Sequence, residues 1–152
     1  MFHKERDMTE HVVRWLIEAG FTVRTETMVG YGYCDVTAYD SDSRRLIAIE
    51  LKLTKITEAM RQASTNQSFA ESYVAFPSTV AHKIIDKPRW EAYLRQGIGI
   101  ISVTQCEVSI LVDAIPCPHS GPDTLHDHIV RRFQRHGSRI STRTIKRRVK
   151  GW

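Results

Sequence analysis

The chain has 152 residues, of which 41% are hydrophobic and 26% charged, a balance typical of one globular domain. This composition excludes collagen, a disordered tail protein and a disulfide-dense scaffold, and no apolar run approaches the roughly 20 residues of a membrane span. The N-terminus lacks the apolar segment of a signal peptide, so we expect none. The three cysteines, Cys34, Cys106 and Cys117, are odd in number and widely spaced, so we expect reduced thiols and a cytoplasmic location.

Basic residues are concentrated at the C-terminus. The net charge is +5, but residues 1–127 contain 13 Lys and Arg against 17 Asp and Glu, whereas the segment after Asp127 contains nine basic residues and no acidic one. Arg outnumbers Lys there, and the guanidinium group binds phosphate through two parallel hydrogen bonds. The pattern favours a nucleic-acid partner over a solubilising tail or an anionic membrane surface.

Hydrophobic periodicity predicts the following elements in chain order: a helix over 9–19, strands over 21–27, 33–39 and 45–53, a helix over about 55–70, a strand over 72–76, a helical region over 80–96 interrupted at Pro88, and strands over 98–103 and 108–112. Prolines 116, 118 and 122 indicate a linker, and two short helices are expected over 124–136 and 141–149, on either side of Gly137. This order predicts an α/β fold, a mixed central sheet flanked by helices. We expect a core domain over 1–115, then a linker and a basic, helical nucleic-acid-binding arm over 116–152.

Charged residues occur on two strands otherwise suited to a core. Glu50 and Lys52 share one face of the 45–53 strand, because side chains alternate along a strand. A turn centred on Asp42 and Ser43 would place Asp35 directly opposite Glu50, with Cβ atoms about 4.5–5.5 Å apart. Two carboxylates so close are costly unless a cation joins them. Lys52 is one such cation, and Mg²⁺ or Mn²⁺ would supply more charge.

A metal at that position could polarise a phosphate oxygen and generate hydroxide from water. Lys52 could orient the water or neutralise developing charge. The alternative is an ordinary hairpin with Glu50 and Lys52 facing solvent. Leu46 and Ala48 share their face of the strand, which favours a central, buried strand instead.

Asp35 and the Glu50-Leu51-Lys52 tripeptide, within a helix–three strands–helix–strand order over residues 9–77, resemble the PD-(D/E)XK nuclease superfamily, including its Holliday-junction-resolvase-like members. The resemblance implies a restriction-endonuclease-like αβββαβ core. It implies that Asp35 and Glu50, with the Leu51 carbonyl, hold Mg²⁺ and that Lys52 assists the attacking water. It also implies supporting roles for Glu10 on the first helix and Gln62 on the next. Cys34 stands where the name-giving Pro would be.

We therefore expect a Mg²⁺-dependent endonuclease acting on DNA. A non-catalytic DNA-binding protein of the same fold and an RNA endonuclease are the alternatives. A homodimer is expected if both strands are cut, because a chain this small offers one active site. The residues expected to contact nucleic acid are Lys55, Arg61, Arg131, Arg132, Arg135, Arg139, Arg143, Lys146, Arg147 and Arg148.

Two further sequence patterns occur in the segment from Cys117 to residue 149. Residues 124–149 could form a helix–turn–helix with Gly137 in the turn, although a basic arm that follows the phosphate backbone is favoured. Cys117-x-His119 and His126-x-His128 resemble zinc ligands, but their spacing matches no standard zinc module. A surface loop is the favoured interpretation there.

Overall fold

The computed structural model describes residues 1–30 and 32–143, with side chains described through residue 135. Its centre is a six-stranded sheet in the order β1-β2-β3-β4-β5-β6. β3 pairs with β4 and β4 with β5 in parallel, whereas the outer pairs are antiparallel. The predicted mixed α/β sheet is therefore confirmed. The strands are β1 (Thr22–Val29), β2 (Gly32–Asp40), β3 (Arg45–Leu51), β4 (Glu71–Pro77), β5 (Gly99–Val103) and β6 (Val108–Val112).

The helices lie between and around these strands. Pro88 interrupts the 80–96 region as predicted, because proline lacks an N–H and cannot continue a helix; α3 ends at Ile85 and a short 3₁₀ helix begins at Pro88. The described helices are α1 (Glu5–Glu18), α2 (Ile56–Asn66), α3 (Ser78–Ile85), the 3₁₀ helix η1 (Pro88–Trp90), α4 (Glu91–Gln96) and α5 (Leu125–Arg143).

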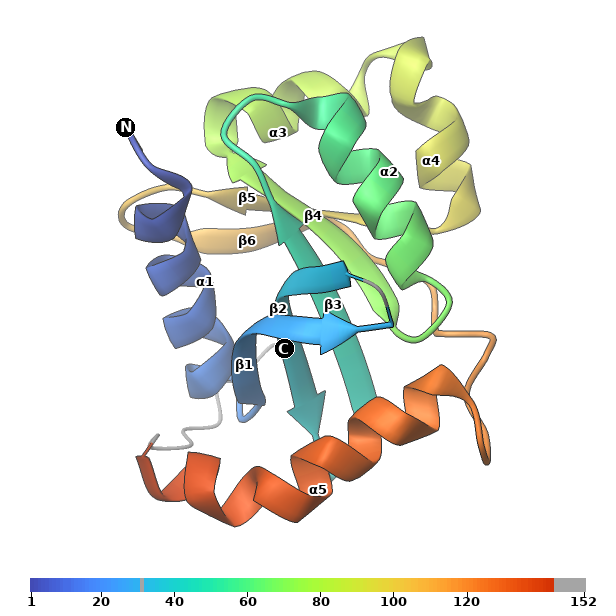
Figure 1. Cartoon of the computed structure of the whole chain (residues 1–152). Helices are drawn as coiled ribbons and strands as arrows, with labels where there is room; N and C mark the ends of the chain where they lie inside the picture. The colour runs from blue at the N-terminus through green and yellow to red at the C-terminus, as the bar shows by residue number, and fades with distance from the viewer. Residues whose placement is uncertain (31, 144–152) are drawn as a thin grey trace.

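Helices cover both faces of the sheet (Figure 1). α1 packs on one face, where Leu16 joins Ile47 and Ile49 of β3 in a buried cluster. On the opposite face, α2, α3 and α4 cover β4 and β5 through residues such as Met60 and Phe76. α5 crosses the β1–β3 half of that face. Alternate residues of β3 thus enter different cores, as the strand's period of two requires.

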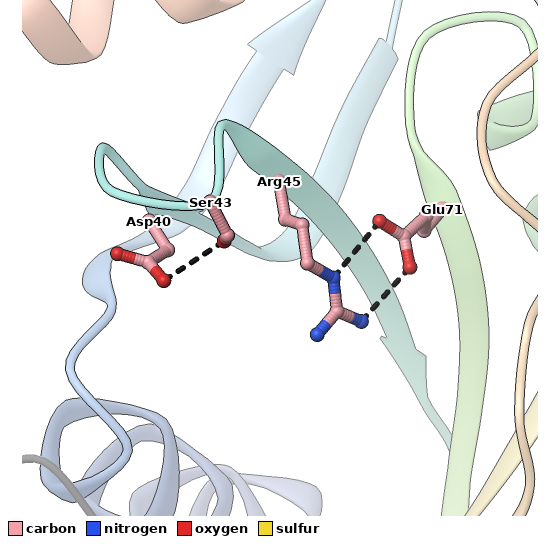
Figure 2. A network of polar contacts seen from close by, with 4 residues as sticks. All are labelled: Asp40, Ser43, Arg45 and Glu71. Carbon is pink, nitrogen blue, oxygen red and sulfur yellow. Dashed lines mark hydrogen bonds and ion pairs between the residues drawn. The ribbon is translucent and has the colours of Figure 1, made fainter.

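Polar contacts join the starts of β3 and β4 (Figure 2). In the β2–β3 turn, Ser43 Oγ donates to Asp40 Oδ2 at 2.8 Å. At the first residue of β3, the Arg45 guanidinium donates to both Glu71 carboxylate oxygens, at 2.9 and 3.1 Å. Because this bidentate pair connects neighbouring parallel strands, it stabilises their register at the end of the sheet opposite the candidate site.

The C-terminal helix differs from the prediction. α5 is one continuous helix through Gly137, so the prediction of two short helices was wrong, and Gly137 does not form the turn of a helix–turn–helix. Glycine is tolerated inside a helix at about 1 kcal/mol relative to alanine. Ile129 and Phe133 are 1% and 2% exposed and belong to the same cluster as Leu46. α5 therefore completes the core over the first three strands.

Candidate active site

The β2–β3 hairpin has the register that the sequence predicts. Val36 pairs with Ile49 and Asp40 with Arg45, so continuation of the ladder would place Asp35 opposite Glu50. The ladder ends at Val36, however. There the N–H of Leu51, which points toward β2, donates to Asp35 Oδ2 at 2.9 Å. The Asp35 carboxylate thus replaces the missing main-chain acceptor and is held at the end of β3.

Strand alternation is interrupted at Asp35. Val36 packs in the α1-side cluster, whereas Cys34, two residues earlier, packs in the cluster beneath α5. On β1, Glu26 opposite Asp35 has a φ of +49° and falls in a gap of the β1–β2 ladder. Regular pairing therefore does not extend to Asp35: Cys34 lies on the Glu50 side of the sheet and Asp35 lines the cavity on the α1 side, while the charge of Asp35 still acts on Glu50.

Glu50 is buried beside α2. Glu50 is 1% exposed, and Asn66 Nδ2 donates a hydrogen bond to Glu50 Oε2 at 2.7 Å. Burial first, and then the negative charge of Asp35, raise the pKa of Glu50 to about 7, against the opposing hydrogen bond from Asn66. The two carboxylates are therefore close enough to interact strongly, and near neutral pH the pair gains from a proton or a cation. The solvent-facing alternative for Glu50 is excluded.

The Cys34 thiol is buried against the same carboxylate. Its Sγ donates to the Val36 carbonyl at 3.2 Å and accepts from Asn66 Nδ2 at 3.6 Å. Burial raises the pKa of Cys34 well above its usual value, and the charge of Glu50 acts in the same direction. The thiol is thus a small neutral neighbour of Glu50.

Lys52 lies one residue beyond β3 and reaches toward α2. Its Nζ pairs with Glu58 Oε1 at 3.1 Å. Burial lowers the pKa of Lys52, but the bond to Glu58 and the charges of Glu5, Glu58 and Asp35 outweigh burial, so the pKa is raised. Lys52 is therefore a protonated cation that interacts with the carboxylates on both sides.

A cavity of about 750 Å³ lies between α1 and the end of β3, and Asp35 and Leu51 line it. Glu10, expected to support the site, lines the same cavity together with Glu5. Sequence reasoning missed Glu5 because the helix was predicted from residue 9, whereas α1 begins at Glu5. Both acidic residues project from the helix face that borders the cavity.

A second cavity, of about 470 Å³, lies on the other side of Glu50 and is lined by Gln62 and Asn66 of α2. Gln62, an expected site residue, therefore does lie near Glu50, and its Oε1 is buried with no hydrogen-bond partner in the described structure. Asn66 was missed. In the sequence, Asn66 is marked only as a polar residue one helical turn after Gln62. That position indicates a contact with Glu50 only when Glu50 is known to be buried beside α2.

The expected nucleic-acid contacts separate into three groups. Lys55 and Arg61 line a cavity of about 600 Å³ at the start of α2, together with Arg89. On α5, Arg131 forms an ion pair with Asp127 at 3.0 Å, and Arg135 is exposed. Arg132, on the same helix, donates a hydrogen bond to the Met28 carbonyl at 2.9 Å. Arg132 thus contributes to packing. Arg139 and Arg143 lie on α5 beyond the described side chains, and Lys146, Arg147 and Arg148 lie outside the described residues.

Metal-ligand chemistry is limited to a small donor set. In the described part of the chain, no three His, Cys, Asp or Glu side chains gather as a metal site. His126, one of the residues with zinc-like spacing, hydrogen-bonds through Nδ1 to the Phe69 carbonyl at 2.8 Å. The donors at the end of β3 are the Asp35 and Glu50 carboxylates and the Leu51 carbonyl, which lies on the same strand edge as the Leu51 N–H. Such oxygen donors suit Mg²⁺ or Mn²⁺, which retain several waters.

Among the helices of residues 1–30 and 32–143, none has the length and apolar character to cross a membrane.

The comparisons with known proteins support the fold of this chain and do not assign it an activity. No protein-family model and no curated protein matches the chain. A protein of unknown function from Silicibacter pomeroyi has a similar structure, with a TM-score of 0.68 at 15% identity over 93% of this chain and 92% of that one. At this identity the similarity supports the shared fold alone.

Two nucleases match more weakly. A repair endonuclease from Pyrococcus abyssi has a TM-score of 0.41 at 18% identity over 68% of this chain and 48% of that one. The complex of EndoMS with double-stranded DNA has a TM-score of 0.37 at 18% identity, over 56% and 44%.

Proposed function

We propose that the protein is a Mg²⁺-dependent nuclease that hydrolyses phosphodiester bonds of DNA by endonucleolytic cleavage. The observation that supports this most directly is the hydrogen bond from the Leu51 N–H to Asp35. It holds one carboxylate at the end of β3, where it interacts with the buried carboxylate of Glu50. A buried carboxylate beside a half-buried one that lines a cavity is expected at functional sites, because a structural role gains nothing from the repulsion.

Asp35, Glu50 and the Leu51 carbonyl would hold the ion. When bound, Mg²⁺ or Mn²⁺ would polarise a phosphate oxygen and lower the pKa of a bound water. Asn66 orients the Glu50 carboxylate through its 2.7 Å hydrogen bond. The cavity between α1 and β3 gives a phosphate access to Asp35.

Lys52 acts as a cation in this proposal. Its raised pKa, supported by Glu58, Glu5 and Asp35, opposes a role as the base that deprotonates water. A protonated Lys52 instead stabilises negative charge as it develops on the phosphate oxygens. Exposed Lys55 and Arg61 beside the start of α2 and exposed Arg135 on α5 would bind the phosphate backbone.

The test is nicking of supercoiled plasmid in Mg²⁺, with EDTA as the metal-free arm. Asp35→Asn removes the charge but keeps an oxygen that can accept from Leu51, so the fold is retained. We expect both Asp35→Asn and Lys52→Ala to lower the rate at least about 100-fold. Asp113→Asn is the matched control, because this exposed residue follows β6 at the far edge of the sheet.

Each alternative gives a different result. Tight DNA binding without metal-dependent nicking would show a non-catalytic DNA-binding protein. Preferential cleavage of RNA in the same buffer would show an RNA endonuclease. A second-order dependence of double-strand cleavage on protein concentration is expected if a homodimer supplies two active sites.

A further inference from the structure

We propose that the cavity at the start of α2 binds one phosphate group of the DNA, with Arg89 of the 3₁₀ helix η1 as a positioning residue beside Lys55 and Arg61. The cavity, of about 600 Å³, is lined by these three cations and by Trp90. In Figure 1 the start of α2 lies beside the connection between α3 and α4, which contains η1. This inference rests on the proposed nuclease function, because it names where a substrate phosphate is held outside the candidate metal site.

Positive charge is in excess at this cavity. Among the described residues that line it, Glu58 is the single acidic one, and its carboxylate is already engaged: Oε1 pairs with Lys52 Nζ at 3.1 Å, and Oε2 lies 4.0 Å from Lys55 Nζ. Within the described part of the chain, neither Arg61 nor Arg89 forms an ion pair. Cations that line one cavity repel each other, and a bound anion would offset that repulsion.

The Arg89 guanidinium lies over a buried aromatic ring. Its central carbon is 4.7 Å from the centroid of the Trp90 ring, and Trp90 is 6% exposed and belongs to the core cluster beneath α2. The neighbouring acidic residue, Glu91, pairs with Arg95 at 2.6 Å. A guanidinium that packs on a ring keeps the N–H groups at its edge available, and phosphate accepts two of them in parallel. Arg89 therefore combines a supported position with donors that suit a phosphate.

The two cavities beside Lys52 differ in the sign of their charge. Four carboxylates and two guanidinium groups line the cavity between α1 and the end of β3: Glu5, Glu10, Glu26, Asp35, Arg6 and Arg14. That charge favours a metal ion, whereas the charge at the start of α2 favours a phosphate. Lys52 lies between the two, because it pairs with Glu58 and also interacts with the charge of Asp35. A strand with one phosphate near Asp35 would therefore place a flanking phosphate at the cavity that Arg89 lines.

Binding is measured in EDTA by fluorescence anisotropy, so that cleavage is not required. The wild type is compared with Arg61→Gln and Arg89→Gln, which each remove one cation from a different element. Lys83→Gln is the control, because this exposed residue of α3 carries the same charge and does not line the cavity. We expect each cavity variant to bind a DNA duplex about 5-fold more weakly or worse, as loss of an exposed charge-assisted hydrogen bond predicts, and the control to bind as the wild type does. Unchanged affinity in both cavity variants would overturn the site.

The salt dependence of binding tests whether the three cations share one phosphate. A triple variant with Gln at positions 55, 61 and 89 should lower the slope of log K against log salt concentration by about 0.9, the value for one phosphate contact on duplex DNA. A decrease of about 1.8 or more would show separate contacts, and no decrease would show solvated surface charge; either result would overturn the single site. Circular dichroism spectra establish that the variants are folded, and a role in folding alone would not change this slope.

Three DNAs of the same sequence distinguish the source of the phosphate: a closed circle, a linear duplex with 5′-phosphates and a linear duplex with 5′-hydroxyl ends. An equal effect of Arg89→Gln on all three supports a backbone phosphodiester as the ligand, and an effect confined to the 5′-phosphorylated duplex supports a terminal phosphate. Cleavage of the circle in Mg²⁺ is measured in parallel. Unchanged binding by both cavity variants with wild-type cleavage intact rejects this inference alone, whereas weaker binding by both variants without any metal-dependent cleavage by the wild type rejects only the nuclease proposal.

Discussion

Replacing Glu50 by Gln should stabilise the metal-free protein at alkaline pH. The fold raises the pKa of Glu50 from 4.5 to about 7, chiefly through burial and then through the charge of Asp35. At about 1.4 kcal/mol per pKa unit, the ionised carboxylate lowers the free energy of unfolding by about 3 kcal/mol. The amide introduced by Glu50→Gln would be neutral at every pH and could still accept the hydrogen bond from Asn66.

The pH dependence follows from the sign of this shift. Below pH 4.5 the carboxyl is protonated in both the folded and the unfolded chain, so it imposes no penalty. Between pH 4.5 and about 7 the unfolded chain ionises first, and the stability of the wild type falls as the pH rises. Above pH 7 the full penalty is present. The variant should match the wild type near pH 4.5 and exceed it by up to about 3 kcal/mol at pH 8, about 6–12 °C in Tm for a chain of this size.

Urea unfolding in EDTA at pH 4.5, 6 and 8 measures the difference directly. Glu107→Gln, an exposed carboxylate on the β5–β6 connection, is the control and should change stability little at any of these pH values. Addition of Mg²⁺ at pH 8 should raise the stability of the wild type and leave Glu50→Gln nearly unchanged, because a ligand that binds only the folded state stabilises it. A variant less stable than the wild type at pH 8, or a difference independent of pH, would refute the argument that ionised Glu50 is under electrostatic strain.

Three further outcomes follow from the packing and the charge distribution. Phe133→Ala should destabilise the protein by about 3–5 kcal/mol in urea unfolding, because it empties a buried site between α5 and the sheet, while exposed Gln134→Ala should have little effect; a loss below about 1 kcal/mol would show that α5 is not part of the core. In the native protein, Cys106 should react rapidly with a disulfide reagent and Cys34 only after unfolding, since Cys34 is buried and its pKa is raised by burial; rapid labelling of Cys34 in folded protein would contradict its placement beside Glu50. Deleting residues 144–152, which include Lys146, Arg147, Arg148 and Lys150, should reduce the salt dependence of DNA binding by up to about four phosphate contacts, and an unchanged slope would argue against a role of these residues in binding. A deletion that began at Val130 would instead remove Phe133 from the core.

Most of the helices and strands, and the pairing of β2 with β3, follow from local sequence patterns. The alternation of Ile47 and Ile49 with Leu46 and Ala48 predicts a strand buried on both faces, and the structure confirms two different cores. The turn residues around Asp42 predict the hairpin register, and the pairing of Val36 with Ile49 confirms it. These features depend on periodicity and on short-range turn geometry, which are properties of neighbouring residues.

The arrangement of the candidate site depends on contacts between distant segments, which local sequence patterns do not predict. The alternation is interrupted at Asp35 because β2 separates from β3 there, and the Leu51 N–H takes the Asp35 carboxylate as its acceptor. No local sequence pattern predicts this separation. The contact of Asn66 with Glu50 joins residues 16 apart, and the hydrogen bond from Arg132 of α5 to the Met28 carbonyl of β1 joins residues 104 apart. Such neighbours are set by how complete helices and strands pack, because burial and hydrogen-bond satisfaction are shared among distant segments.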